Sequence, residues 1–412
     1  MVERADIAVV GAGPSGAAAA IAGARAGLGV VLVDRAAFPR DKYCGDGLTA
    51  AALRELEELG LDPAEVPSWR FLRSLAIRSP GGRWVDLELP DDEGWYAAVA
   101  RRTDLDAAVL DLARAAGAKV HDGRGVTGAH LGADRVTLDT TGETVEARYL
   151  VGADGMWSPT RRFLGTRTEG YRGEWHAFRQ YYRDVTTRAA TTLVVWFEPD
   201  ILPGYAWSFP LGDGHVNVGF GIVRGGRHRT ADMRTLWPDI LARSHVREVL
   251  GDDATPDGPH RAWPIPARVD RTTLARGRAL WVGDAAAAVD PMTGEGIAQA
   301  LETGRWAVES IVAAGPWDAG GARSGYERAV RQGLVTDHRL SRTLMRALGH
   351  RKGTRFPLWL VDRSDWTRRN FARWMWEDYP RAVLATPRRW HRGMLAGPGA
   401  YRGAPYQSGL AA

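Results

Sequence analysis

Apolar residues in the first part of the chain follow two patterns that succeed each other. Residues 7–10 and 30–33 are short, continuous apolar runs rich in β-branched side chains, which is typical of parallel strands buried on both faces. Residues 17–26, between these runs, are rich in alanine and predict a closely packed helix. A strand, a helix and a second strand joined by short connections predict a parallel, doubly wound α/β sheet.

A different pattern, the alternation of apolar and small or polar residues, runs from residue 205 to residue 221. Tyr205, Trp207 and Phe209 fall on one face of a predicted strand, and the Gly-Asp-Gly turn at 212–214 leads into a second strand. This arrangement predicts a β-hairpin. By periodicity alone, the aromatic face is more simply explained as a sheet core than as the wall of a ligand site.

The connection between the first strand and the first helix is a G-x-G-x-x-G turn made by Gly11, Gly13 and Gly16. The first glycine permits the tight turn, the second lets the backbone approach a pyrophosphate, and the third lets the helix pack on the strand. The helix N-terminus offers N–H groups to phosphate. Asp34 ends the second strand, where a carboxylate binds ribose hydroxyls and favours FAD or NAD over NADP. A glycine-rich turn that binds no ligand is the weaker interpretation, because the first strand, the helix, the second strand and Asp34 all follow in the expected order and spacing.

Two later strand ends distinguish FAD from NAD. One apolar strand stops at Asp154-Gly155 and another at Gly283-Asp284, where the backbone can turn sharply and the carboxylate can meet a sugar or ribityl hydroxyl. Residues 291–297 then open a helix whose N-terminal amides are expected to face an isoalloxazine edge. Ligands bind at such places in open α/β sheets. A dehydrogenase that binds only NAD needs neither of these motifs, so FAD is predicted.

With these motifs in order, the chain resembles the superfamily of flavoprotein monooxygenases and reductases. GAGPSG stands at 11–16, GADG at 152–155 and GDAA at 283–286. The resemblance implies an α/β fold: a Rossmann-type FAD-binding domain like those of p-hydroxybenzoate hydroxylase and glutathione reductase, an antiparallel β-sheet substrate domain and a C-terminal helical region. It also implies that Arg102, in an R-x-x-(F/L)-D helix start, contacts FAD, with Arg101 as the alternative.

The residues that the resemblance implies for FAD binding lie in the glycine turn, at the end of the second strand and just after it, at the Arg102 helix start, and around the two later aspartates. They are Gly11, Ala12, Gly13, Pro14, Ser15, Gly16, Asp34, Arg35, Cys44, Gly45, Arg102, Val126, Asp154, Gly155, Gly283, Asp284, Pro291, Gly294, Gly296 and Ile297.

A narrower resemblance lies in the segment FPRDKYCGDGL at 38–48. It matches the pattern F-P-R-x-K-x-C-G-x-x-(L/I) of the geranylgeranyl reductase branch. The motif Y-x-W-x-F-P at 205–210, followed by N-(V/I)-G at 217–219, is a second match. Enzymes of this branch saturate the isoprenoid tails of diphosphates, lipids and menaquinone. The resemblance covers roughly residues 5–310 and implies a small apolar, isoprenoid-like substrate.

In this branch reduced FAD delivers a hydride to one alkene carbon, and a proton reaches the other. Cys44, the only cysteine in the chain, is the candidate catalytic residue, as proton donor or substrate-positioning group. The alternative is a small buried residue that fills a gap. Tyr205, Trp207 and Phe209 are the candidate substrate-binding wall. Because the chain has one dinucleotide turn, electrons are expected from NAD(P)H bound transiently or from a carrier protein.

Other functions stay open. The runner-up is an FAD-dependent monooxygenase acting on an aromatic or polyketide-like molecule, which shares the fold and the FAD motifs; only 38–48 and 205–210 argue against it. A flavin halogenase would carry a W-x-W-x-I-P motif and an essential lysine, for which Lys42 is the only candidate. A flavin-binding or lipid-carrier protein without turnover is the last alternative. No Cys or His cluster has metal-ligand spacing and there is no P-loop, so no metal is expected.

The composition of the chain indicates in which compartment the protein is expected. A single cysteine excludes an intramolecular disulfide and indicates a reducing compartment. The first residues lack a signal-peptide pattern. No window reaches about 18 uninterrupted apolar residues, the length typical of a membrane-spanning helix. A cytoplasmic protein, at most peripheral to the inner membrane face, is therefore expected.

Charge is distributed unevenly along the chain. The net charge is +5, yet residues 350–412 carry 12 Lys+Arg against 4 Asp+Glu, together with five of the 17 tryptophans. Residues 331–392 interleave Arg and Trp in a helical pattern. One interpretation is a helical cap whose tryptophans pack on the body; the other is an interfacial patch that contacts an anionic membrane surface. Nothing else supports nucleic acid as a partner, and none is expected.

The predicted domains follow these patterns. The FAD-binding domain is discontinuous and comprises residues 1–70, 98–165 and 269–330. The substrate domain comprises residues 71–97, a hairpin with a turn at Gly81-Gly82, and residues 166–268. Residues 331–392 form the C-terminal helical region. Residues 393–412, rich in Gly, Pro and Ala, are expected to be a loosely ordered tail.

Overall fold

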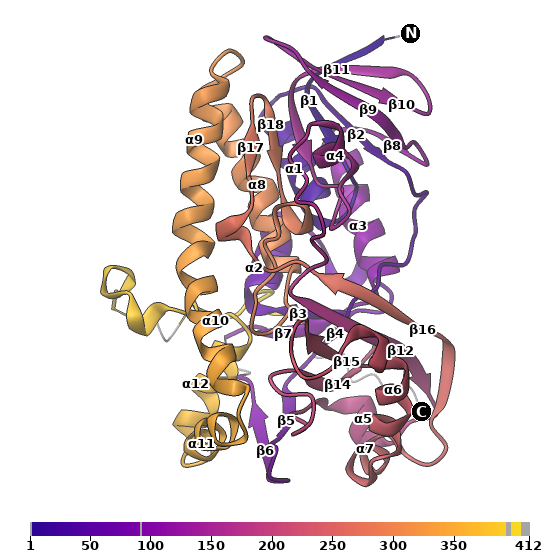
Figure 1. Cartoon of the computed structure of the whole chain (residues 1–412), viewed down its shortest axis with the longest axis vertical. Coiled ribbons are helices and arrows are strands. Elements are labelled where there is room, and N and C mark those ends of the chain that lie inside the picture. Colours follow the sequence, from indigo (N-terminus) through magenta and orange to yellow (C-terminus); the bar gives the residue numbers. More distant parts are fainter. Residues whose placement is uncertain (1, 91–92, 393–396, 405–412) are drawn as a thin grey trace.

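The computed structural model describes residues 2–90, 93–392 and 397–404. Two large sheets, one above the other in Figure 1, form the body, and the last helices run along one side of both. The α/β fold class predicted from the sequence is confirmed. The predicted domain boundaries remain a prediction.

The upper sheet contains the dinucleotide turn. Its strands follow the order β17-β18-β11-β1-β2-β8, and β9 and β10 extend it as an antiparallel meander on β11. The pairs from β18 to β8 are parallel. The bounds are β1 (Val2–Val10), β2 (Val30–Asp34), β8 (Lys119–Asp122), β9 (Val126–Leu131), β10 (Val136–Thr140), β11 (Thr144–Gly152), β17 (Ala275–Arg276) and β18 (Ala279–Trp281). Helices cover one face of β1 and β2 and the meander covers the other, which explains their unbroken apolar runs.

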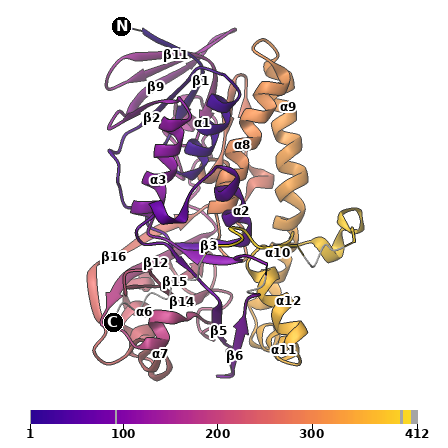
Figure 2. The same cartoon turned by 180° about the vertical axis from the view of Figure 1, so that it is seen from behind.

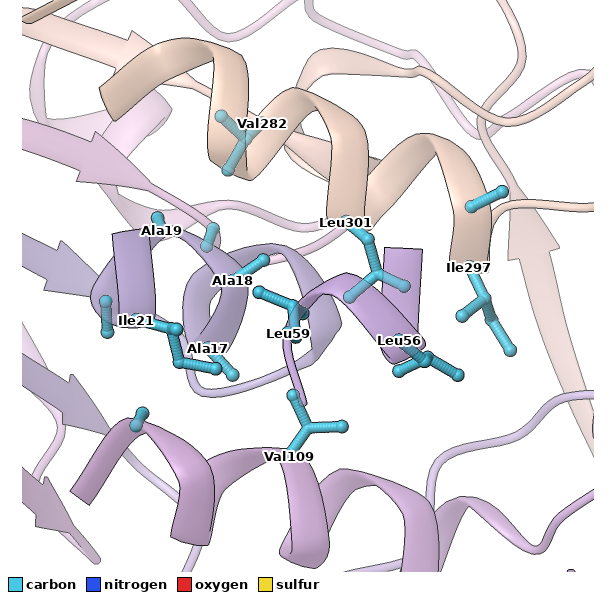
Figure 3. Close-up of a cluster of buried hydrophobic side chains, with 14 of the residues drawn as sticks. Ala17, Ala18, Ala19, Ile21, Leu56, Leu59, Val109, Val282, Ile297 and Leu301 are labelled. Carbon is cyan, nitrogen blue, oxygen red and sulfur yellow. The ribbon is translucent and has the colours of Figure 1, made fainter. Parts of the chain in front are cut away.

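The helices on one face of this sheet are α1 (Pro14–Arg25), α2 (Ala50–Glu58), α3 (Arg102–Ala115) and α8 (Ile297–Ala314), whereas the short α4 (Pro159–Phe163) packs near β9 on the meander side. In Figure 3, α1 lies between α8 and α3, and the leucines of α2 fill the space beside it. The alanine-rich sequence of α1 permits this approach. A Cβ at Gly304 of α8 would lie 2.2 Å from the carbonyl oxygen of Ser15, so the two helices touch backbone to backbone.

The lower sheet has seven strands in the order β16-β12-β15-β14-β13-β5-β6. The bounds are β5 (Ser74–Arg78), β6 (Trp84–Glu88), β12 (Trp175–Arg183), β13 (Leu193–Trp196), β14 (Tyr205–Pro210), β15 (Val216–Val223) and β16 (Thr255–Ile265). The hairpin predicted from residue 205 onward is β14–β15, paired antiparallel. The sheet is antiparallel except at β13 and β5, which pair in parallel; strands far apart in sequence form this pair, so local patterns did not reveal it.

The alternation of β14 separates two faces of the lower sheet. Ala206 faces a core formed with α5 (Thr187–Thr191), α6 (Met233–Ala242) and α7 (Ser244–Leu250). Tyr205, Trp207 and Phe209 face the opposite way, into a cavity. A small sheet of β3 (Gly47–Thr49), β7 (Ala97–Val99) and β4 (Arg70–Phe71) connects the two large sheets.

The C-terminal region is helical, as predicted, and Figure 2 shows it from behind. It comprises α9 (Ala319–Val330), the π-helical turn Arg331–Val335, α10 (Thr336–Leu348), α11 (Arg351–Val361) and α12 (Asp365–Met375). Short 3-10 turns occur at Pro63–Glu65, Thr230–Asp232, Val269–Arg271, Gly283–Ala286, Val383–Ala385 and Pro387–Arg389. None of the described helices is long and apolar enough to cross a bilayer.

Part of the predicted loose tail is packed. Ala400 is fully buried and pairs with Trp95 through two backbone hydrogen bonds of 2.8 and 2.9 Å. The ring of Tyr401 lies against Trp69, and Arg54 donates to the carbonyl of Pro398 at 2.8 Å. Residues 397–404 therefore differ from the prediction, because buried partners supplied by distant segments hold them. The rest of the predicted tail, 393–396 and 405–412, lies outside the described residues.

Candidate functional site

One cavity of about 1170 Å³ lies where the carboxyl ends of the upper sheet meet the inner face of the lower sheet. It is larger than the roughly 300–1,000 Å³ of an ordinary small-molecule pocket. Its upper end is lined by polar groups that follow β1, β2, β11 and β18, and its lower end by aromatic and aliphatic side chains. A cavity of this size and polarity has room for a dinucleotide together with an apolar ligand.

The β1–α1 turn forms part of the polar end. Gly11 has a φ of +103°, and a Cβ there would lie 2.2 Å from the carbonyl oxygen of Ala153, so only glycine fits. Gly13 is the N-cap of α1, and no described side chain caps that helix. The first N–H groups of α1 are therefore available to an anion at the cavity edge.

Asp34 lies beside this turn at the end of β2. Its carboxylate accepts hydrogen bonds from the backbone N–H of Ala12 at 2.6 Å and of Ala36 at 2.8 Å. These bonds fix the carboxylate at the cavity wall, next to Arg35 and Val126. The position suits the recognition of ribose hydroxyls.

Arg102 and Arg101 point in different directions. Arg102 lines the cavity and binds the carboxylate of Asp106 through two hydrogen bonds of 2.7 and 2.8 Å. Arg40 contacts the same carboxylate at 2.8 Å. Arg101 instead pairs with Asp213 at 2.7 Å. The R-x-x-L-D spacing thus orients the first residue of α3 toward the cavity and holds it there.

Asp154 and Asp284 follow β11 and β18 at the same edge of the sheet, and both line the cavity. Asp154 accepts from the hydroxyl of Ser158 at 2.6 Å and the N–H of Thr160 at 2.8 Å, so it also caps α4. Burial raises its pKa. Asp284 lies 3.6 Å from the ammonium of Lys42, which stacks over the ring of Trp263. Burial lowers the pKa of Lys42.

Most of the residues predicted to bind a cofactor line the cavity. They are Gly11, Gly13, Pro14, Ser15, Asp34, Arg35, Cys44, Gly45, Arg102, Val126, Asp154, Gly155, Asp284, Gly294, Gly296 and Ile297. Four others shape the turns around it without lining it: Ala12, Gly16, Gly283 and Pro291. Their roles in binding remain a prediction.

The opening of α8 differs from the expectation. Its first N–H groups, on Ile297 and Ala298, are occupied by the carboxyl of Glu295 at 2.8 and 3.4 Å, so they do not face the cavity unpaired. Burial, and then the nearby Glu377, raise the pKa of Glu295 to about 8. The motif PMTGEGI contained this glutamate, but nothing local indicated that it would cap the helix.

Cys44 lies in a loop that the hairpin of the lower sheet holds in place. The amide of Asn217 donates to the carbonyl of Cys44 and to the carboxyl of Asp46, each at 2.8 Å. Trp207 donates to the other end of the same amide at 3.1 Å, and Tyr181 donates to Asp46 at 2.7 Å. The segment 38–48 and the β14–β15 hairpin are thus held together by these hydrogen bonds.

The thiol of Cys44 is half-buried at the cavity wall. Burial raises its pKa, and the guanidinium of Arg102 opposes that shift only in part. The group therefore stays a protonated thiol at neutral pH. Trp207 and Phe209 lie directly on the loop: a Cβ at Gly45 would meet their rings at 3.5–3.6 Å.

Asp46 is the buried carboxyl of this loop and is fully inaccessible. Burial raises its pKa from 3.8 to about 6, against the opposing hydrogen bonds from Asn217 and Tyr181. Because the pKa of Asp46 is higher in the folded than in the unfolded protein, its protonated carboxyl stabilises the fold. This stabilisation is fully present below about pH 3.8 and is lost as the pH rises through about 6.

We expect Asp46→Asn to gain stability relative to the natural chain as the pH rises. A shift of this size corresponds to about 3 kcal/mol between roughly pH 4 and pH 7. Urea unfolding of both proteins across that range measures the difference, with Asp86→Asn, an exposed carboxyl of β6, as the matched control. A difference that does not change with pH would contradict the assignment to Asp46.

The apolar end of the cavity has two walls. Tyr205, Trp207 and Phe209, which the alternation placed on one face of the strand and the family resemblance made candidate wall residues, line it from β14. The opposite wall comes from the C-terminal helices, through Leu344, Leu348, Leu358, Phe371, Trp374 and Met375. No motif in the Arg and Trp pattern of these helices indicates that they reach the cavity. Trp374 and Trp376 face inward, whereas Trp359 and Trp366 are exposed.

Comparison with known proteins supports the fold and the polar end of the cavity. Residues 4–305 match the family model described as an FAD binding domain. The menaquinone reductase of Mycobacterium tuberculosis is 38% identical over 329 residues, 75% of this chain and 77% of that protein. The digeranylgeranylglycerophospholipid reductase 1 of Methanopyrus kandleri is 32% identical over 320 residues, 75% of this chain and 80% of that protein.

A solved structure agrees with the arrangement of the two sheets. The geranylgeranyl bacteriochlorophyll reductase-like protein of Thermoplasma acidophilum superposes with a TM-score of 0.78 at 21% identity, covering 93% of this chain and 99% of that protein. At this identity the likeness concerns the fold.

Proposed function

Because this chain belongs to the geranylgeranyl reductase family of FAD-binding oxidoreductases, we propose that it saturates carbon–carbon double bonds in the isoprenoid chain of a membrane lipid or quinone. The observation that carries the proposal is the single cavity in which a dinucleotide-binding edge, the Cys44 thiol and a long aromatic wall meet.

The polar end fits FAD. The uncapped N-terminus of α1 suits a pyrophosphate, the fixed carboxylate of Asp34 suits a ribose, and the guanidinium of Arg102 is aimed at the same space. Asp154 and Asp284 would hold sugar or ribityl hydroxyls. Reduced FAD supplies the two electrons and one hydrogen, as hydride, that alkene reduction needs.

Cys44 supplies the proton that completes the reduction. An isolated alkene has no carbonyl to stabilise charge, so hydride and proton must reach its two carbons in close succession. The thiol remains protonated at neutral pH because burial raises its pKa, and the Asn217 and Asp46 contacts hold its loop. The resulting thiolate, next to Arg102, takes a proton back from solvent.

The aromatic wall positions the chain. Tyr205 donates to the carbonyl of Thr293 through its hydroxyl, so its polar end is satisfied and its ring remains apolar toward the cavity. An unsaturated chain that lies along Tyr205, Trp207 and Phe209 passes the Cys44 loop, and the opposite wall from α10 and α12 excludes water. The electron donor is proposed to be NAD(P)H, bound transiently, or a carrier protein.

The experiment that tests this function is an anaerobic single-turnover measurement. The FAD-loaded protein is chemically reduced and mixed with geranylgeranyl diphosphate, which has no quinone ring for the flavin to reduce, and flavin reoxidation is followed by absorbance. We expect reoxidation without oxygen and a product heavier by two hydrogens for each bond reduced. Reoxidation that occurs only with oxygen, together with a hydroxylated aromatic product, would replace the reductase by a monooxygenase.

A further inference from the structure

We propose that α11 and the start of α12 form a docking surface for an anionic lipid bilayer, through which an isoprenoid chain enters the cavity. This inference rests on the proposed function for its substrate. The surface itself is defined by Phe356, Trp359, Leu360 and Trp366, whose exposed fractions are 64%, 44%, 50% and 67%. The two helices lie at the lower end of the molecule, opposite the loop that joins α8 and α9 (Figure 1).

The pattern of α11 is unusual for a surface helix. Its inner side is apolar and packed, with Thr354, Leu358 and Val361 buried. Its outer side should then be polar, yet Phe356 and Trp359 stack on each other there at 5.9 Å between ring centroids. Apolar side chains on both sides of a helix indicate that its outer side is also covered, by a lipid bilayer or another apolar surface.

The basic residues around these rings indicate what covers them. Arg373 is buried against Asp378 and Arg368 pairs with Asp362 and Asp365, so the cations that matter for the outer side are those of α11. Arg351, Lys352 and Arg355 are exposed beside the aromatic rings, and the guanidinium of Arg363 lies 4.9 Å from the ring of Trp359. Aromatic rings at the lipid interface, flanked by cations, match the surface of an anionic bilayer. A purely apolar protein partner would not need the cations.

The surface is continuous with the cavity. Pro357 and Leu358 line the cavity, while their neighbours Phe356 and Trp359 point outward. Phe371, Trp374 and Met375 of α12 line the same cavity end. Pro357 is exposed and also lines the cavity, so the cavity reaches the outer surface at α11. An isoprenoid chain would enter at this point.

Vesicle flotation tests the proposal without any turnover. The FAD-loaded protein is mixed with vesicles of phosphatidylglycerol and phosphatidylcholine, or of phosphatidylcholine alone. We expect the natural chain to float with the anionic vesicles and much less with the neutral ones. The triple variant Phe356→Ser, Trp359→Ser, Trp366→Ser should lose binding by about tenfold or more. The pair Arg351→Glu and Lys352→Glu should lose it on anionic vesicles.

Trp317→Ser is the matched control, because Trp317 is equally exposed, at 68%, in the distant α8–α9 loop. It should float like the natural chain. The triple variant should also keep its bound flavin and its turnover of a short, water-dispersed isoprenoid diphosphate, while turnover of vesicle-embedded substrate falls.

Four outcomes would overturn the proposal. They are absence of binding to anionic vesicles, equal binding to neutral vesicles, equal loss in Trp317→Ser, and a dimer that the triple variant dissociates, which would make a second copy the occupant. Failure of flotation together with successful anaerobic reduction would remove the docking surface and leave the proposed function standing.

Discussion

Replacing Cys44 by alanine is expected to lower the rate of alkene reduction by about a hundredfold or more while FAD remains bound. The thiol keeps its proton because burial raises its pKa, so it is suited to donate that proton as the hydride arrives. The backbone of the loop is held by Asn217 through the carbonyl of Cys44, which the substitution does not change. The measurement is the single-turnover rate of flavin reoxidation by substrate, with the visible flavin spectrum as the check on cofactor content.

Cys44→Ser is the companion variant, and it separates chemistry from shape. A serine hydroxyl has nearly the same size but is a far weaker acid, so the rate should fall almost as far as in the alanine variant. If serine restores the rate, the thiol acts by size or hydrogen bonding. If both variants keep kcat and only KM rises, Cys44 positions the substrate and the proton comes from another group.

Local sequence patterns predict those parts of the molecule whose conformation depends on residues that are close together in the chain. The turn at Gly11 needs a positive φ and a close approach to Ala153, and only a glycine at that point of a strand–turn–helix unit supplies both. The hairpin β14–β15 is specified by alternation and a Gly-Asp-Gly turn. Such features appear directly in the order of residues, so the upper sheet and the hairpin were predictable, whereas the aromatic face became a candidate cavity wall only through the family resemblance.

The contacts that were not predicted join residues far apart in the chain. Asn217 reaches Cys44 and Asp46 across more than 170 positions, and neither its motif nor theirs states that they meet. Glu295 caps α8 from within a loop that was expected to face a cofactor. Residues 397–404 pack because Trp95 and Trp69 offer buried partners, although their composition resembles a loose tail.

The two interpretations of the Arg and Trp segment also could not be separated by sequence, because different residues of the segment favour each of them. Trp374 and Trp376 pack inward, toward the cavity, as the cap interpretation requires. Trp359 and Trp366 are exposed beside cations, as the interfacial interpretation requires. Helical periodicity specifies the spacing of these residues, but the direction each one faces depends on how α11 and α12 fold back on the body.

Arg102→Met is expected to cause the largest loss of both stability and FAD content. Arg102 binds the carboxylate of Asp106, which is 1% exposed, through two hydrogen bonds. Removing one partner of a buried ion pair leaves the other charge without compensation, at a cost of about 3–5 kcal/mol. Arg40 still contacts Asp106, which places the expected loss at the lower end of that range. Denaturant unfolding and the flavin content of the purified protein measure the two effects.

Arg101→Met is the control, since it changes the same residue type one position away. Arg101 pairs with a partly exposed carboxylate, Asp213, outside the cavity, and an ion pair of that kind contributes about 1 kcal/mol or less. We therefore expect this variant to keep its flavin and nearly all of its stability. Equal losses in the two variants would mean that the start of α3 matters only as a structural element. A selective loss in Arg102→Met would show that the guanidinium aimed into the cavity holds the cofactor, which is the role that the family resemblance implies for this arginine.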